Sequence, residues 1–271
     1  MPDTAAVGAF RKKVRTFYRR RGRDLPWRHT DDSYRILVSE IMLQQTQVSR
    51  VIEKYDDFLG RFPDIVSLAD APLQDIMEAW QGLGYNRRAL SLKKLAERVV
   101  RDFGGVIPER EEELKTLPGI GSATAAAICA FAYNQPVVFL ETNIRAVYIH
   151  HFFDGRSPVG DGELLPLVAR TLDRRNPRRW YNALMDYGVF LKKHHANPAR
   201  SSERYRKQSP FEGSNRQVRG AILRVLVERR ELSEEELVAE MPFEPVKVRK
   251  NLEELVREGI VTKKKALFSV G

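Results

Sequence analysis

The 271-residue sequence lacks the marks of several protein classes. It has one cysteine, Cys129, which excludes a disulfide within the chain and an iron–sulfur cluster held by the chain's own cysteines. No apolar run reaches the roughly 18 residues that a membrane-spanning helix needs, so we expect no membrane association. The arginine-rich N-terminus lacks the apolar core of a secretory signal, and we expect an intracellular protein.

Acidic residues are in the minority, with 36 Asp and Glu against 46 Lys and Arg, which gives a formal net charge of +10. A positive balance of this size suits a polyanionic partner such as nucleic acid. Many soluble proteins are basic, however, so charge alone leaves the partner open.

The segment Leu117-Pro118-Gly119-Ile120-Gly121 predicts a tight turn that opens into a helix of small residues. Its glycines let the backbone approach another molecule closely, and the helix start has unpaired N–H groups at the positive end of the helix dipole. In a basic protein this arrangement favours a nucleic-acid phosphate. The alternative is an ordinary helix start that follows a glycine turn.

Apolar residues recur at helical spacing up to about residue 192, and convincing period-2 alternation is absent there. Short breaks that contain Gly, Pro or Asp separate the helical stretches. The pattern predicts an all-α fold. After an amphipathic first helix, the expected helices cover 34–48, 50–60, 73–81, 86–102, 109–115, 122–133, 140–152, 162–173 and 178–192.

A polar linker is expected at 197–213, followed by a separate module at 214–271. Its pattern is a helix near 215–229, a helix capped by Ser233 and Glu236, a helix begun by Pro245 and a lysine-tipped hairpin. This order resembles a winged helix. The front of its recognition helix would carry Lys247, Arg249, Lys250 and Asn251. Contact with DNA and contact with another protein both remain open for such a module.

Glu40 is the one acid in the apolar part of the helix expected at 34–48. Its neighbours three and four residues away are Ile36, Leu37, Leu43 and Gln44, so it faces a largely apolar stripe. A buried carboxyl group is expected to have a raised pKa and is a candidate general acid. A structural acid paired with an arginine is the alternative, and we prefer that alternative for Asp186.

Four motifs in order resemble the helix-hairpin-helix DNA glycosylase superfamily, closest to its adenine DNA glycosylases of the MutY type. They are Ser39 to Val48, Gly82 to Tyr85, Leu117 to Gly121 and Asn143 to Arg145. The resemblance implies a two-lobed fold over 1–196, with one lobe at 30–135 and the other made of 1–29 and 136–196. It also implies an enzyme that flips a nucleotide and cuts its N-glycosidic bond.

The resemblance assigns roles to individual residues. Glu40 corresponds to the acid that protonates the departing base. Gln45 and Tyr85 correspond to residues that enter the base stack. The segment 117–121, with Leu117, Gly119 and Gly121, corresponds to a hairpin that grips a DNA phosphate, often with a metal ion at its backbone carbonyls. Asn143 corresponds to an active-site amide.

Three departures from the family pattern change these expectations. Glu141 occupies the place of a second catalytic carboxylate, which is Asp in the family. Ala123 stands where strand-cutting relatives carry a lysine, so we expect no lyase activity. Residues 192–195 are Lys-Lys-His-His where most relatives have cysteines that hold an iron–sulfur cluster. We therefore expect no cluster and no metal bound by side chains.

We expect a monofunctional enzyme, a monomer in the cytoplasm or nucleoid, that acts on mispaired or damaged double-stranded DNA. It would remove adenine opposite guanine or 8-oxoguanine, with Glu40 as acid and Glu141 as the charge that stabilises the sugar cation. The module at 214–271 takes the place of the domain by which relatives recognise 8-oxoguanine, so little discrimination between these partners is expected. A thymine or uracil mismatch glycosylase and a non-catalytic DNA-binding protein are the alternatives.

Overall fold

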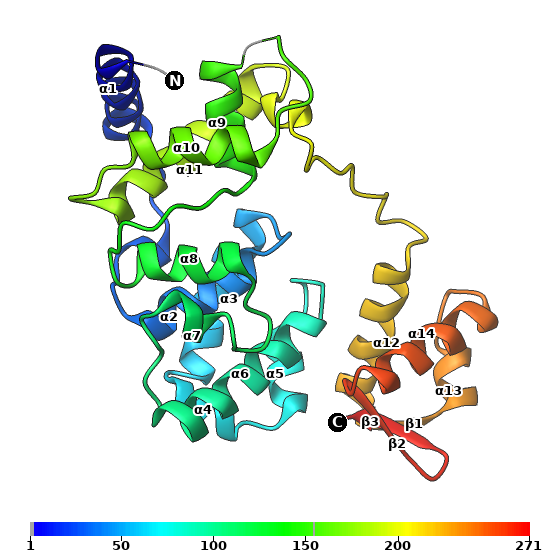
Figure 1. Ribbon diagram of the computed structural model, residues 1–271. Helices are drawn as coiled ribbons and strands as arrows, with labels where there is room; N and C mark the ends of the chain where they lie inside the picture. The colour runs from blue at the N-terminus through cyan, green and yellow to red at the C-terminus, as the bar shows by residue number, and fades with distance from the viewer. Residues whose placement is uncertain (1–2, 154) are drawn as a thin grey trace. The chain divides into compact units, whose positions relative to one another are not determined.

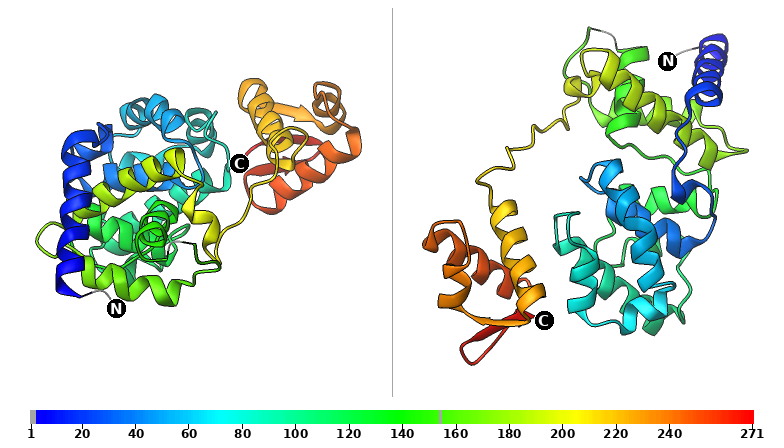
Figure 2. Two further views of the ribbon diagram at one scale, coloured as in Figure 1. Left: turned by 90° about the horizontal axis from the view of Figure 1, so that it is seen from above. Right: turned by 180° about the vertical axis from the view of Figure 1, so that it is seen from behind.

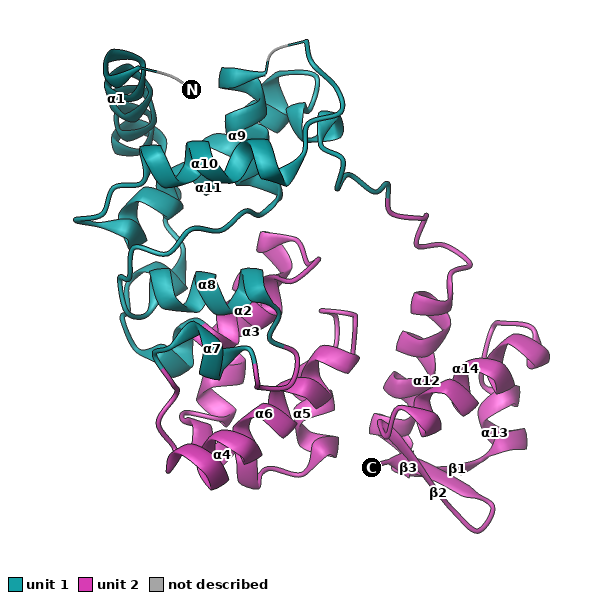
Figure 3. Ribbon diagram, in the orientation of Figure 1, with its two compact units in different colours: residues 1–36, 109–115, 120–207 teal, residues 37–108, 116–119, 208–271 magenta. Residues whose placement is uncertain are grey.

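The computed structural model describes residues 3–153 and 155–271, and its described chain is largely helical, as predicted (Figure 1). The chain divides into two compact units, which Figure 3 shows in different colours. Unit 1 consists of residues 1–36, 109–115 and 120–207, and unit 2 of residues 37–108, 116–119 and 208–271. Helix α2 (Ser33–Leu43) begins in unit 1 and ends in unit 2.

Unit 1 is built around the packing of α9 against α11. An aromatic cluster that includes Phe10, Tyr148 and Trp180 fills its core. The helices of the unit are α1 (Thr4–Arg21), η1 (Pro26–Arg28), α7 (Glu111–Leu114), α8 (Ser122–Phe131), α9 (Thr142–Phe152), α10 (Asp161–Thr171), α11 (Pro177–His194) and η2 (Pro198–Ser201).

Asp186 of α11 is a structural acid, as predicted. Its carboxylate accepts hydrogen bonds from Arg23 Nε at 2.6 Å and from Arg28 Nη1 and Nη2, both at 2.8 Å. The arginines hold the pKa of Asp186 below its ordinary value although burial raises it. These bonds tie the segment after α1 to the middle of α11.

Residues 197–207, in the expected linker, lie in unit 1. They include η2, in which Ala199 is buried, and an isolated parallel bridge joins Ser202 to Val159. The part of the chain that begins at Gln208 belongs to unit 2.

The first half of unit 2 is a helical layer in which α4 packs against α6. Its core includes Phe58, Trp80 and Leu92. The helices are α3 (Val48–Arg61), α4 (Ile65–Asp70), α5 (Leu73–Ala79) and α6 (Arg87–Phe103). The helix expected at 34–48 is shorter than predicted, because α2 ends at Leu43 and Gln45 has a left-handed backbone with φ of 56°.

The C-terminal module, residues 214–271, forms three helices and a three-stranded antiparallel sheet in the order β1-β3-β2 (Figure 2). The predicted capping box is confirmed, because Ser233 Oγ accepts from the Glu236 N–H. Gln74 of α5 donates to Val227 O at 2.9 Å and ties the module to the helical layer. The elements are α12 (Asn215–Arg229), β1 (Glu231–Ser233), α13 (Glu234–Ala239), α14 (Pro245–Arg257), β2 (Val261–Lys264) and β3 (Leu267–Val270).

Candidate active site and nucleic-acid interface

Glu40 lies in the last turns of α2 and is half-buried. One turn before Glu40, Ile36 is 2% exposed and Leu37 is fully buried, whereas Leu43 and Gln44 one turn after it are half-buried. The predicted apolar stripe is therefore buried on the N-terminal side of Glu40, while Glu40 itself keeps some access to solvent. Such a position suits a group that exchanges a proton with a bound molecule.

A tight turn before α6 presents Tyr85. Gly82, Gly84 and Tyr85 all have positive φ angles, of 89°, 71° and 49°. A tyrosine in this left-handed region is strained, and the surrounding structure must hold it there. Trp80 contributes, because its Nε1 donates to Gly84 O at 3.2 Å.

Arg88 connects this turn to the end of α2, and sequence reasoning missed it. Its Nη1 donates to Ile41 O and Met42 O, both at 2.8 Å, and its Nη2 donates to Gly84 O at 3.0 Å. The carbonyls at the end of a helix lack partners within the helix and carry the negative end of its dipole. Burial lowers the pKa of Arg88 to about 10, so the side chain remains a cation at neutral pH.

The hairpin before α8 has the geometry that its glycines predict. Gly119 has a φ of 79°, and a Cβ placed on it would lie 2.8 Å from Ser91 Cβ. Gly121 is the N-cap of α8 and has no side chain that could occupy the N–H groups of the first turn. Ser122 beside it is exposed, whereas Leu117 is 3% exposed and packs in the core. The start of α8 thus remains open to an anion.

Glu141 is the N-cap of α9 in unit 1. Its Oε1 accepts from the backbone N–H groups of Asn143 at 2.8 Å and Ile144 at 2.9 Å. Its Oε2 accepts from Asn143 Nδ2 at 3.0 Å. Burial raises the pKa of Glu141, while the two backbone bonds and the charges of Lys192 and Arg145 act in the opposite direction. The Asn143 amide and the N–H groups at the start of α9 thus orient the Glu141 carboxylate.

Helix α11 supports this cap through Gly188 and Lys192. A Cβ on Gly188 would lie 2.2 Å from Asn143 O, so only glycine permits this approach of the two helices. Lys192 follows one turn later on the same face. Burial lowers the pKa of Lys192, and Glu141 raises it. No sequence signal marked Gly188, because the glycine occupies the interior of a helix.

The predicted recognition helix α14 has its basic residues mostly engaged within the module. Lys247 donates to Gly213 O, and Arg249 pairs with Glu234 at 2.7 Å. Lys250 is exposed. The expectation that Asn251 lies on the front of this helix is wrong, because its side chain is fully buried and donates to Lys247 O at 2.8 Å.

The structure places the predicted site residues in both units. Glu40, Gln45, Tyr85 and Gly119 lie in unit 2, whereas Glu141, Asn143 and Gly121 lie in unit 1. Within residues 3–153 and 155–271, no three His, Cys, Asp or Glu side chains are grouped so that they could hold a metal ion. No helix in the described chain has the length and apolar character needed to cross a bilayer.

A largely helical fold that combines a glycine hairpin before a helix, a half-buried acid and a carboxylate oriented by a helix start is the arrangement expected of a helix-hairpin-helix protein that acts on DNA. The model of the HhH-GPD superfamily of base excision DNA repair proteins matches residues 38–160. The chain belongs to this superfamily, and the resemblance inferred from its motifs is confirmed.

Curated relatives are adenine DNA glycosylases. The protein of Mycobacterium tuberculosis (strain CDC 1551 / Oshkosh) is 36% identical over 230 residues, which cover 78% of this chain and 76% of the relative. The Homo sapiens protein is 34% identical over 201 residues, which cover 70% of this chain and 37% of the relative.

Solved structures agree on the fold. A thermostable thymine-DNA glycosylase has a TM-score of 0.62 and 28% identity, and the match covers 68% of this chain and 87% of that one. A trapped endonuclease III–DNA covalent intermediate has a TM-score of 0.55 and 17% identity, with coverage of 78% and 92%. The second likeness, at this identity, supports the fold alone.

Proposed function

We propose that the protein is a monofunctional DNA glycosylase of base excision repair that removes adenine opposite guanine or 8-oxoguanine. The observation that carries the proposal is the 36% identity over 230 residues to an adenine DNA glycosylase. The half-buried Glu40 and the capped Glu141 supply the two carboxyl groups that hydrolysis of an N-glycosidic bond needs.

In this mechanism Glu40 donates its proton to N7 of the flipped adenine, and the bond between the base and C1′ then breaks. The sugar becomes an oxocarbenium-like cation, which the negative charge of Glu141 stabilises. Asn143 Nδ2 holds Oε2 of Glu141 in place. Water adds to C1′, and the proton that it releases returns Glu40 to its acid form.

A panel of lesion duplexes tests the function. We expect release of adenine opposite guanine and 8-oxoguanine at comparable rates, detected as strand breaks after alkali treatment of the abasic product. The similarity to a thymine-DNA glycosylase favours one second candidate, which is excision of thymine or uracil opposite guanine. Release of a pyrimidine with adenine left intact would establish that candidate instead.

An iron–sulfur cluster does not fit the residues present. The chain has one cysteine, and the Cys129 Sγ donates to Glu109 O at 3.3 Å. Burial raises the pKa of this thiol to about 11, whereas cluster ligands are thiolates. We therefore predict a colourless protein, and elemental analysis should find far less than stoichiometric iron. A stoichiometric iron content would contradict the prediction. A metal ion at the hairpin carbonyls remains compatible with the proposal.

Lyase activity is not expected, because Ala123 in the first turn of α8 has no amine to form a Schiff base. Incubation with substrate and borohydride should trap no covalent protein–DNA complex, and strand breaks should require alkali. A trapped complex would contradict this. Loss of that complex in Lys192→Met would then assign the reacting amine to Lys192.

The rate should depend on pH in a bell shape, because Glu40 must be protonated and Glu141 ionised. Activity is thus lost as the pH falls through the pKa of Glu141. Lys192→Met removes a charge that lowers this pKa, so the acid limb should move to higher pH. Single-turnover rates across the acidic and neutral range measure the shift. Lys193→Met, at the exposed neighbouring position, is the control, and equal midpoints in both variants would contradict the role of Lys192.

A further inference from the structure

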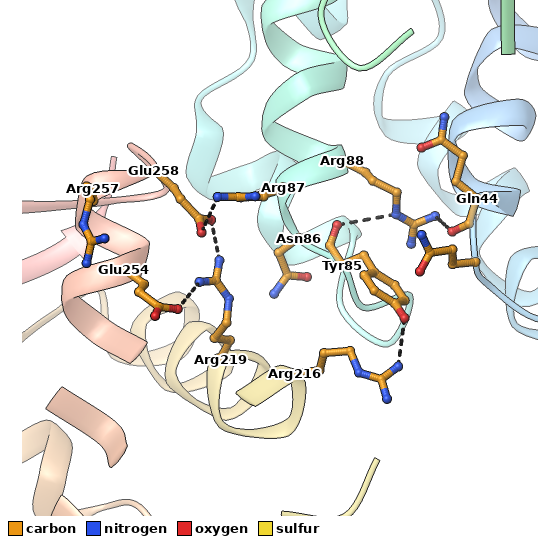
Figure 4. A pocket seen from close by; sticks show the side chains of 11 residues that line it. Gln44, Tyr85, Asn86, Arg87, Arg88, Arg216, Arg219, Glu254, Arg257 and Glu258 are labelled. Carbon is orange, nitrogen blue, oxygen red and sulfur yellow. Dashed lines mark hydrogen bonds and ion pairs between the residues drawn. The ribbon is translucent and has the colours of Figure 1, made fainter. Parts of the chain in front are cut away.

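The hydroxyl of Tyr85 is bound by the C-terminal part of the chain within unit 2 (Figure 4). Arg216 Nη1, from the first turn of α12, donates to it at 2.8 Å, and Gln208 Nε2 also donates to it. The Arg216 guanidinium lies 5.5 Å from the centroid of the Tyr85 ring, within the range of a cation–π contact. Arg216 Nη2 donates to Ser209 O at 2.7 Å. Among the residues that the structure describes, the partners of Arg216 are therefore uncharged, and no ion pair offsets its positive charge.

A cavity of about 730 Å³ adjoins this contact. Five arginines and two glutamates contribute to its wall, so it carries an excess of three positive charges. Arg219 and Arg87 engage Glu258, and Arg219 also reaches Glu254 at 3.5 Å. Gln45 lines the same cavity and is exposed. Gln45 and Tyr85, which the family resemblance assigns to the base stack, therefore line the same cavity as arginines of α12 and α14.

Arg257 adds a further cation at the end of α14. Among the described residues no hydrogen bond or ion pair engages it. The front of α14 differs, because Lys247 and Arg249 make bonds inside the module and Asn251 is buried. Arg216 and Arg257 therefore place two cations without an acidic partner in the described chain on the side of Tyr85.

We propose that the C-terminal module binds DNA through Arg216 and Arg257, beside the Tyr85 turn, and not through the front of α14. The ligand is the phosphodiester backbone of the duplex next to the mispair. Guanidinium groups match the geometry of phosphate oxygens and form strong, charge-assisted hydrogen bonds with them. The proposal rests on the proposed function, since it assumes that Tyr85 and Gln45 meet DNA.

The salt dependence of duplex affinity tests this surface. Each phosphate contact contributes about 0.9 to the slope of log affinity against log salt. Arg216→Met in the full-length protein should reduce the slope by about 0.9 and Arg216→Met with Arg257→Met by about 1.8. Arg224→Met removes the same charge from an exposed position on α12 and should change the slope little. Lys250→Met tests the front of α14 and should have a smaller effect than Arg216→Met.

Arg216→Lys separates charge from the hydrogen bond to Tyr85. It should retain most of the slope, because the cation remains. Thermal unfolding of each variant checks that the module stays folded. A wild-type slope in the folded double variant, or a larger loss in Lys250→Met, would overturn the proposal. Affinity for a mispaired duplex and base release are separate readouts. If the variants changed the salt slope but the wild-type protein released no base, the proposed function would be rejected and the DNA-binding surface kept. If the protein released the base but the variants left the slope unchanged, the surface would be rejected and the function kept.

Discussion

Glu40→Gln is expected to lower base excision strongly and to preserve DNA binding. Glutamine has nearly the shape of glutamic acid, so the packing beside the buried Ile36 and Leu37, one turn away on α2, should be kept. It has no acidic proton for the departing base. General acid catalysis contributes about 100-fold to 10,000-fold in typical enzymes, and we expect a loss in this range.

Single-turnover excision and equilibrium binding to the same mispaired duplex measure the two effects of Glu40→Gln separately. Glu53→Gln is a matched control, because Glu53 lies exposed on α3 in the same unit. Nearly wild-type excision by Glu40→Gln would remove Glu40 from the mechanism. A parallel loss of binding would instead assign it a structural role.

Glu141→Gln is expected to lower the excision rate by about 100-fold to 1,000-fold, as the loss of one preorganised electrostatic group does in other enzymes. The charge that would stabilise the sugar cation disappears. The amide oxygen can still accept from the N–H groups of Asn143 and Ile144, so α9 should keep its cap. The amide nitrogen would then face the Asn143 side chain, whose amide can rotate so that Oδ1, which has no partner among the described residues, accepts from it. The hydrogen bond is then kept in the opposite direction, so we expect little loss of stability.

Glu141→Asp is the companion variant. Aspartate keeps the charge and is a good N-cap, so this variant should retain much more activity than Glu141→Gln. Rates at saturating enzyme and thermal unfolding distinguish the loss of charge from a loss of folding. If Glu141→Gln excised within a few-fold of the wild-type rate, the electrostatic role of Glu141 would be rejected.

Patterns of neighbouring residues predicted a structural feature correctly where the interactions that form the feature are themselves between residues close in the sequence. Helical periodicity predicted the class of the fold, and the Ser233–Glu236 spacing predicted a capping box that the structure contains. Gly119 was singled out as a turn residue, and its φ of 79° agrees. The sequence predicted the ends of the helices less accurately. The helix predicted at 34–48 ends at Leu43, and the carbonyls of Ile41 and Met42 accept from the distant Arg88 instead.

The sequence by itself determined the helical class, the hairpin, the family and the identity of Glu40 as the candidate acid, because each depends on residues close together in the chain. Only the tertiary structure decided that Arg88 binds the end of α2 and that Arg216 donates to the Tyr85 hydroxyl. It also decided that Gly188 packs closely against Asn143 and that Asn251 is buried. The bond from Arg88 to Ile41 joins residues 47 positions apart, and the bond from Arg216 to Tyr85 joins residues 131 positions apart. Backbone carbonyls carry no sequence signature, and the burial of an amide depends on the helices that pack over it. A linear pattern cannot therefore show which distant partner an arginine or a glycine will meet.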